Sequence, residues 1–186
     1  KEFKLPKDAA AGWWQPKLDG IRALADPVTG ALWSRSRKRI TGLPHLEEAI
    51  RAMALRGKTP PMRFLDGELY VHGLHFQEIQ SRVRRSVAIA QDANVIQLHV
   101  YDAVMDEPFE KRLAAISDWV DDPTNKVVVV PTAPWTPDQT DSCHSQAVQQ
   151  GYEGCMVRVE GDDRYKAGPT RSSHLLKVKR FLQEEF

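Results

Sequence analysis

Short strand-like segments alternate irregularly with a few longer helix-like segments along this chain, which limits the folds open to it. Segments rich in branched and aromatic residues predict strands at 13–16, 21–25, 31–34, 64–71, 96–104, 127–131, 155–159 and 175–178. Periodic apolar residues predict helices at 46–56, 76–83, 110–120 and 142–149, the last with Thr140 or Asp141 as its N-cap. Proline-rich or polar residues predict connections at 58–62, 121–125 and 131–140. Because strands and helices do not alternate one by one, we expect an α+β fold of antiparallel sheets with flanking helices.

The length favours one globular domain over residues 1–186, because 186 residues with 41% hydrophobic content can bury a sizeable core. Apolar runs such as 127–130 are far too short to cross a bilayer, and no signal-peptide pattern is visible. Cys143 and Cys155 lack the CxxC spacing of a zinc site. We therefore expect reduced cysteines and no structural zinc.

The net charge of +1 does not by itself indicate a nucleic-acid-binding protein. The positive charge is nevertheless clustered, at Arg35, Arg37, Lys38 and Arg39, at Arg82, Arg84 and Arg85, and at Lys177, Lys179 and Arg180. Such clusters can neutralise phosphates and make binding dependent on salt. Each cluster taken alone is equally compatible with an ordinary solvated face.

The sequence Lys-Leu-Asp-Gly-Ile-Arg at 17–22 is the most informative stretch for function. It brings a potential nucleophile, Lys17, close to the carboxylate of Asp19 and the fixed cation of Arg22. A lysine attacks only as the neutral amine, and its unperturbed pKa of about 10.4 leaves it charged at pH 7. Such a short motif also fits an ordinary surface turn, so it acquires weight only from further motifs.

Further motifs follow in a fixed order: SRS at 34–36, LDGEL at 65–69, HVYD at 99–102, EGCMVR at 153–158 and LKVK at 176–179. This ordered set resembles the covalent nucleotidyltransferases, a superfamily of DNA ligases, RNA ligases and mRNA capping enzymes. Residues 151–158, followed by Tyr165-Lys166 and by 175–179, are most similar to ATP-dependent DNA ligases of the compact phage or bacterial type. The resemblance spans nearly the whole chain and implies an ATP-grasp-like nucleotidyltransferase domain.

Lys17, Asp19, Lys177 and Lys179 form the catalytic group that the resemblance implies. Lys17 would be the covalent nucleophile. Lys177 and Lys179 are two residues apart, so in a strand both point to one face, where they can hold the α-phosphate of a nucleotide. Two cations close to Lys17 would also disfavour its protonated form.

Carboxylates and arginines of the same motifs imply metal and phosphate contacts. By similarity, Glu153 and, less directly, Asp66 are ligands of Mg²⁺, which needs few protein carboxylates because phosphate and water complete its coordination. Glu68 matches a glutamate that accepts a hydrogen bond from a ribose hydroxyl in related ligases. Arg22 and Arg35 resemble the phosphate contacts of the family.

Three side chains match the base contacts of the family. Tyr101 corresponds to the aromatic residue that stacks on the base, and Met156 would cover the other face. Gln15 lies two residues before Lys17, where many ligases carry a glutamate that accepts from the adenine amino group. The amide oxygen of Gln15 can do the same, although glutamine departs from the pattern.

The activity implied is ATP-dependent DNA ligation, in which Lys17 forms lysyl-AMP, AMP passes to the 5′-phosphate of a nick, and the 3′-hydroxyl displaces AMP. ATP and Mg²⁺ are the expected cofactors, nicked double-stranded DNA the expected partner, and a monomer in the cytoplasm of a bacterial or phage-infected cell the expected context. Ligases continue into an OB-fold domain, which the sequence lacks after Phe186. We therefore expect an isolated adenylation domain that is impaired in the first step.

Other members of the superfamily and one non-enzymatic function remain as alternatives. An RNA ligase or an mRNA guanylyltransferase would use the same lysine, the latter with GTP. NAD⁺-dependent ligation fits less well, because those enzymes carry a nicotinamide-binding domain before the lysine and only sixteen residues precede Lys17 here. A catalytically impaired nucleic-acid-binding module would keep the fold without the activity.

Overall fold

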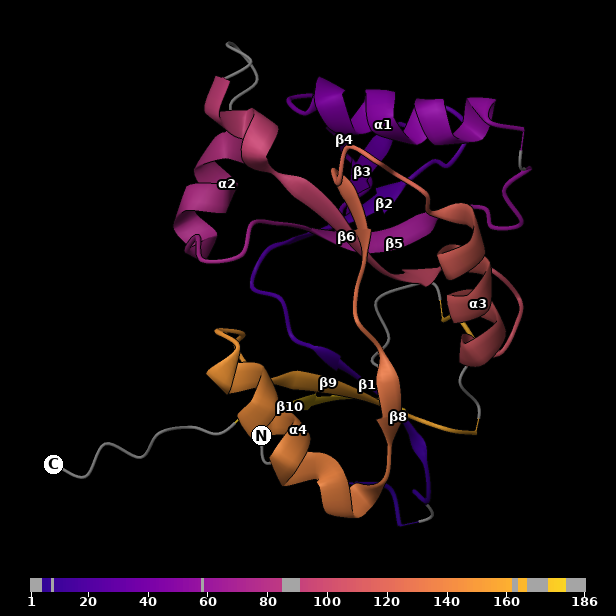
Figure 1. The fold of residues 1–186 in the computed structure, drawn as a ribbon, viewed down its shortest axis with the longest axis vertical. Helices are drawn as coiled ribbons and strands as arrows, with labels where there is room; N and C mark the ends of the chain where they lie inside the picture. The colour runs from indigo at the N-terminus through magenta and orange to yellow at the C-terminus, as the bar shows by residue number, and fades with distance from the viewer. Residues whose placement is uncertain are drawn as a thin grey trace, which may run out of the picture. The chain divides into compact units, whose positions relative to one another are not determined.

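A computed structural model describes residues 5–7, 9–57, 59–84, 91–161, 164–166 and 174–179. The chain forms two compact units, one made of Lys1–Leu18 together with Pro131–Phe186 and the other of Asp19–Val130. Each unit combines a sheet with helices (Figure 1), which confirms the predicted α+β class. In the described part of the chain, no helix has the length and apolar character needed to span a membrane.

The first unit contains a four-stranded antiparallel sheet in the order β10-β9-β1-β8. Its strands are β1 (Gly12–Pro16), β8 (Ala133–Trp135), β9 (Cys155–Val159) and β10 (Leu175–Val178). The short 3₁₀ helix η2 (Pro137–Gln139) leads into α4 (Thr140–Gln149), which Figure 1 draws in orange beside the sheet.

The two faces of this sheet differ because successive side chains of a strand point to opposite sides. One face packs on α4: Cys155, Val157 and Val178 of the strands form a buried cluster with Cys143 and Ala147 of the helix. The other face carries the residues in between, so the polar side chains of β1, β9 and β10 share one surface.

The second unit contains a six-stranded sheet in the order β4-β3-β2-β5-β6-β7. Its strands are β2 (Ile21–Ala25), β3 (Leu32–Ser34), β4 (Arg39–Ile40), β5 (Leu65–Tyr70), β6 (Gln97–Ala103) and β7 (Val127–Val129). The helical segments are α1 (Pro44–Leu55), α2 (Phe76–Arg84), the 3₁₀ helix η1 (Gln91–Val95) and α3 (Phe109–Trp119). Helix α3 packs on β6, while α1 contacts β7 and α2 contacts β2.

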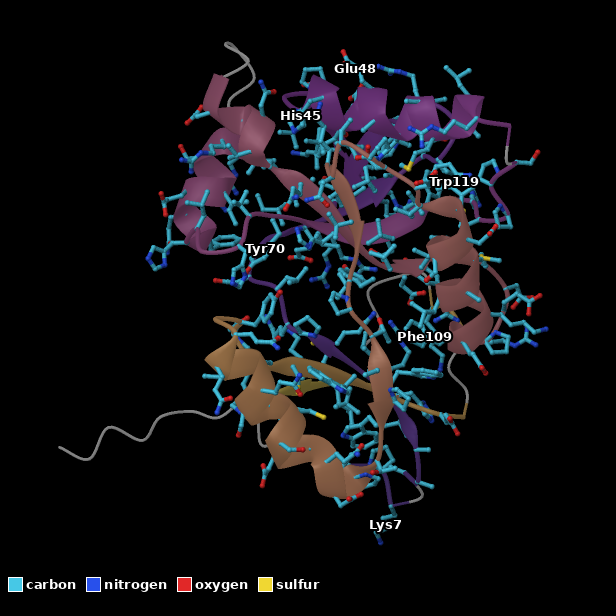
Figure 2. The ribbon with its side chains drawn as sticks, in the orientation of Figure 1. Lys7, His45, Glu48, Tyr70, Phe109 and Trp119 are labelled. Carbon is cyan, nitrogen blue, oxygen red and sulfur yellow. The ribbon has the colours of Figure 1, made fainter. Side chains whose placement is uncertain are left out.

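Helix α1 shows how the sequence directs burial in this unit. Its buried residues are His45, Leu46, Ala49, Ile50 and Met53, a spacing that places them on one side of a helix. A ring nitrogen of His45 lies 2.9 Å from the carbonyl oxygen of Ile96, whereas Glu48 is exposed (Figure 2). Burial lowers the pKa of His45, so the neutral imidazole is favoured there.

The structure corrects several details of the predicted elements. Helix α4 begins at Thr140 with Gln139 as its N-cap, so neither Thr140 nor Asp141 caps it. Strand β8 lies inside the predicted connection 131–140; it contains Pro134, which an edge strand tolerates because proline cannot donate to a ladder. Strand β4 is also additional, and β7 pairs with β6 in parallel, so the second sheet is not purely antiparallel.

Candidate active site

The backbone pairing of β1 with β9 continues past the end of β1 and places Lys17 beside Glu153. The amide N–H of Lys17 donates to the carbonyl of Gly154 at 2.8 Å, and that of Glu153 donates to the carbonyl of Lys17 at 3.3 Å. The Lys17 ammonium group donates a hydrogen bond to Oε2 of the Glu153 carboxylate. The Lys17 side chain is only 14% exposed, so this ion pair is largely screened from bulk water.

Lys179 reaches the same carboxylate from the end of β10. Its ammonium group pairs with Oε1 of Glu153, while Lys17 pairs with Oε2. The register of β10 with β9, in which Val178 lies opposite Cys155, brings Lys179 to this position. One carboxylate therefore lies between two lysines, and the cluster carries a formal charge of +1.

Gly154 allows the close backbone approach on which this cluster depends. Its φ of +145° lies in a region that L side chains rarely adopt, and a Cβ built there would lie 2.5 Å from the carbonyl oxygen of Val178. Any larger residue would push β10 away from the turn that carries Glu153.

Four side chains lie side by side in one row across the sheet, next to the lysine cluster: Thr132, Gln15, Met156 and Lys177. Gln15 and Lys177 both lie opposite Met156 in the strand register. Thr132 lies one residue before β8, where the register of β8 with β1 continues opposite Gln15. The Gln15 side-chain Nε2 donates to Thr132 Oγ1 at 2.8 Å. Thr132 was not predicted as a site residue, because β8 has no strand signal of its own around Pro134.

The second unit pairs Arg22 with Asp66. Nε and one terminal nitrogen of Arg22 donate to the two carboxylate oxygens of Asp66 at 2.9 and 2.6 Å. The Asp66 side chain is only 2% exposed, whereas that of Arg22 is 44% exposed, so the buried carboxylate anchors an accessible guanidinium group. Glu68 lies opposite Arg22 in the register of β5 with β2.

Tyr101 precedes a buried ion pair that was not predicted. Asp102 accepts hydrogen bonds from Nε and Nη2 of Arg112 in α3 at 2.7 and 3.2 Å. Arg112 is fully buried and also donates to the carbonyl oxygen of Glu107 at 2.6 Å. Arg112 and Asp102 lie ten residues apart in sequence, and their contact is visible only in the structure, where α3 packs on β6.

A cluster of polar aromatic side chains lies across β5 and β6. His99 is opposite Glu68 in the register, and its ring meets that of Tyr70 edge to face with centroids 5.3 Å apart. Tyr70, labelled in Figure 2, has its hydroxyl 3.1 Å from Nδ1 of His72. Burial, reinforced by the charge of His72, lowers the pKa of His99 to about 4. His99 is therefore neutral at pH 7.

The remaining site predictions fall in different places. Asp19 and Arg35 are exposed in the second unit, the latter in the turn between β3 and β4. Tyr101 belongs to the second unit and Met156 to the first, and each is placed within its own unit. Arg85 and Arg180 of the basic clusters lie outside the described residues.

Neither cysteine has the character of a nucleophile. Cys143 and Cys155 are buried free thiols. Burial, with a contribution from Cys143, raises the pKa of Cys155 to about 12, and burial also raises that of Cys143. Both thiols are therefore protonated at neutral pH. In the first unit, Lys17 is the candidate nucleophile that lies against a carboxylate and a second cation.

Within the described residues, no group of three or more His, Cys, Asp or Glu side chains is arranged to hold a metal ion. A magnesium site built here would therefore rest on one or two carboxylates. Glu153 offers hard oxygen donors, which suit Mg²⁺. The Asp66 side chain is only 2% exposed, whereas that of Glu153 is 27% exposed, so Glu153 is the carboxylate that an ion can reach more easily.

Known proteins resemble this chain in sequence pattern and in fold. The family model described as ATP dependent DNA ligase domain matches residues 4–179. No curated protein matches the chain.

Solved structures share the fold at low sequence identity. The structure titled Pmar-Lig_Pre. superposes with a TM-score of 0.78 at 20% identity, covering 94% of this chain and 43% of that one. A structure from a study of Lig E DNA ligases has a TM-score of 0.72 at 23% identity, covering 97% and 68%. The Chlorella virus DNA ligase-adenylate has a TM-score of 0.66 at 21% identity, covering 90% and 62%. The chain thus spans less than half the length of the first of these structures.

Proposed function

Because this chain belongs to the ATP-dependent DNA ligase domain family, we propose that residues 1–186 form the adenylation domain of an enzyme that seals nicks in double-stranded DNA. The observation that carries the proposal is the pairing of Lys17 with Glu153, which also pairs with Lys179. A lysine nucleophile needs a group that takes its proton and cations that stabilise the charge of the reacting phosphate. The first unit supplies both.

In the first step, Nζ of Lys17 attacks the α-phosphorus of ATP. A nitrogen–phosphorus bond forms, the bond from this phosphorus to the bridging oxygen breaks, and pyrophosphate leaves with the electron pair. Before the attack, the ammonium group loses one proton to Glu153, with which it is hydrogen-bonded, and the amine loses its second proton to solvent as the nitrogen–phosphorus bond forms. The product is lysyl-AMP.

The cations of β10 stabilise the phosphates. Lys177 lies in β10 and Lys179 directly follows its end, and both are exposed, so they can neutralise α-phosphate oxygens. Glu153 would also hold Mg²⁺, which supplies charge neutralisation for the triphosphate when bound. A divalent cation beside two lysines requires the negative charge of the nucleotide, so we expect metal and ATP to bind together.

Each unit, taken by itself, offers candidate nucleoside contacts. In the first unit, Gln15 offers its amide to the base edge and Met156 an apolar face. In the second, Tyr101 would stack on the base, Glu68 would accept from a ribose hydroxyl, and Arg22, held by Asp66, would contact a phosphate.

In the later steps, a 5′-phosphate oxygen of the nick attacks the AMP phosphorus and releases Lys17. The neighbouring 3′-hydroxyl then attacks the 5′-phosphate and expels AMP. The exposed turn between β3 and β4, with Arg35, Arg37 and Lys38, offers charges for the DNA backbone. We place this reaction in the cytoplasm of a bacterial or phage-infected cell.

Intact mass spectrometry of the full polypeptide tests this function. The protein is incubated with Mg²⁺ and ATP, GTP or NAD⁺, beside the variants Lys17→Ala and Lys7→Ala. Lys7 is an exposed lysine of the same unit (Figure 2) and serves as the matched control. We expect an AMP adduct with ATP in the wild type and in Lys7→Ala, and none in Lys17→Ala.

Other adduct patterns would contradict the proposal. An adduct that persists in Lys17→Ala would mean that another residue is the nucleophile. A GMP adduct with GTP alone would indicate a guanylyltransferase, and sealing of nicked RNA but not of nicked DNA would indicate an RNA ligase.

A further inference from the structure

We propose that Thr132 is a specificity-determining residue that selects adenine over guanine by fixing the side-chain amide of Gln15. This inference rests on the proposed function, because it concerns the base of the nucleotide that Lys17 would attack. Thr132 need not touch the nucleotide; it acts through Gln15.

Thr132 is held opposite Gln15 by the sheet itself. The register of β8 with β1 pairs Trp13 with Pro134 and Trp14 with Ala133, and the next position along places Thr132 beside Gln15. Neighbours on adjacent strands point to the same face. Gln15 is only 5% exposed and its Nε2 lies 2.8 Å from Thr132 Oγ1, so the amide has little freedom to rotate.

The direction of this hydrogen bond decides what Gln15 presents to a ligand. A glutamine amide has a donor end and an acceptor end, and the two can exchange by a half-turn of the side chain. With Nε2 directed to Thr132, the acceptor oxygen is the end turned away from Thr132.

A hydrogen-bond acceptor at the position of the Gln15 side-chain oxygen distinguishes adenine from guanine. Adenine carries an amino group, a donor, at the position where guanine carries a carbonyl oxygen, an acceptor. The Gln15 oxygen pairs with the former and repels the latter. A freely rotating amide would accommodate either base, and Met156, the next side chain in the row, gives apolar contact that does not discriminate.

The test is the ratio of the dissociation constants for the α,β-methylene analogues of GTP and ATP, which cannot release pyrophosphate, measured by calorimetry with Mg²⁺. Thr132→Val keeps the shape of the side chain but removes the hydroxyl, and Thr132→Ser keeps the hydroxyl. We expect the preference for ATP to fall roughly tenfold in Thr132→Val, which is the effect of losing one hydrogen-bonding contact that distinguishes the edges of the two bases. The preference should persist in Thr132→Ser.

A second substitution provides a rescue that a merely structural role would not give. Glutamate at position 15 has only acceptor oxygens when ionised, so its rotation does not matter. We therefore expect Gln15→Glu to restore the preference for ATP in the Thr132→Val background, and Gln15→Glu alone to bind ATP selectively.

The outcomes separate this inference from the proposed function. If the wild type binds ATP selectively and Thr132→Val keeps the same ratio, Thr132 does not determine specificity. If Gln15→Glu does not bind ATP selectively, residue 15 does not face the amino group of the base and the inference is overturned. If the wild type binds neither nucleotide, the proposed function itself fails and this inference fails with it.

Discussion

The ammonium group of Lys17 is hydrogen-bonded to the carboxylate of Glu153. A hydrogen-bonded carboxylate stabilises the charged form of the lysine, although only the neutral amine attacks phosphorus. The ion pair therefore represents a resting arrangement. Chemistry requires the lysine to lose a proton, and among the described residues of the first unit this carboxylate is hydrogen-bonded to it and can take that proton.

Glu153→Gln tests the importance of this carboxylate. Glutamine has nearly the same shape but neither charge nor basicity, so we expect lysyl-AMP formation to slow by about 100-fold or more. Single-turnover mass spectrometry gives the rate, and calorimetry shows whether ATP still binds. Glu160→Gln is the matched control, because Glu160 is an exposed glutamate directly after β9. Equal rates for the two variants would exclude a catalytic role for Glu153.

Gly154→Ala tests the close backbone approach beside Glu153. A methyl group would lie 2.5 Å from the Val178 carbonyl oxygen, and the φ of +145° is strained for alanine. We expect a loss of about 1–3 kcal/mol in the free energy of unfolding, together with slower adenylation. Urea titration and the single-turnover assay measure the two effects.

Gly73→Ala is the control for the backbone angle alone. Gly73 has a φ of +85°, and nothing lies within 4 Å of a Cβ built there. The Gly73→Ala substitution should lower the free energy of unfolding by about 1–2 kcal/mol and leave adenylation unchanged. A Gly154→Ala variant that is no less stable than Gly73→Ala would show that β10 can move away without cost.

Much of the fold was predictable from the sequence because local patterns and tertiary structure agree. Strands β2, β9 and β10 begin and end where their apolar residues predict. Strand β8 was missed because its three residues include a proline and their pairing with β1 is a long-range property. The parallel pairing of β7 likewise depends on topology, which a short run of valines does not encode.

The candidate site was predictable where a motif carries it. Lys17, Glu153 and Lys179 were named from their motifs, and the strand pairing brings them together. The partners that hold site residues in place were not predictable, since Thr132 and Arg112 have no motif and act through contacts across 117 and 10 residues of sequence. The pairing of Asp66 with Arg22 likewise emerged only from the structure.

Arg112→Gln tests the buried ion pair behind Tyr101. Removal of one partner leaves Asp102, 3% exposed, without its compensating charge. We expect a loss of about 3–5 kcal/mol in the free energy of unfolding, measured by urea titration. Arg56→Gln is the control, because Arg56 forms an exposed ion pair with Asp121 that should contribute about 1 kcal/mol or less. Similar losses in both variants would mean that the burial of Arg112 does not matter.

The burial of His99 makes stability depend on pH in a defined window. Its pKa falls from the usual 6.5 to about 4 in the folded protein, so between these values the unfolded chain binds a proton that the folded chain does not. Above pH 6.5, His99 is neutral in both states and does not change the free energy of unfolding. As the pH falls from 6.5 toward 4, the free energy of unfolding decreases by about 3 kcal/mol in all.

Urea titrations at pH 7.5, 6 and 5 measure this dependence. Other groups titrate in the same range, so the comparison is with His99→Gln, which lacks the ionisable ring and should lose less stability between pH 7.5 and 5 than the wild type. His75→Gln, which removes an exposed histidine, should keep the wild-type slope. If His99→Gln and the wild type lose stability in parallel, the imidazole of His99 is protonated as easily in the folded protein as in the unfolded chain.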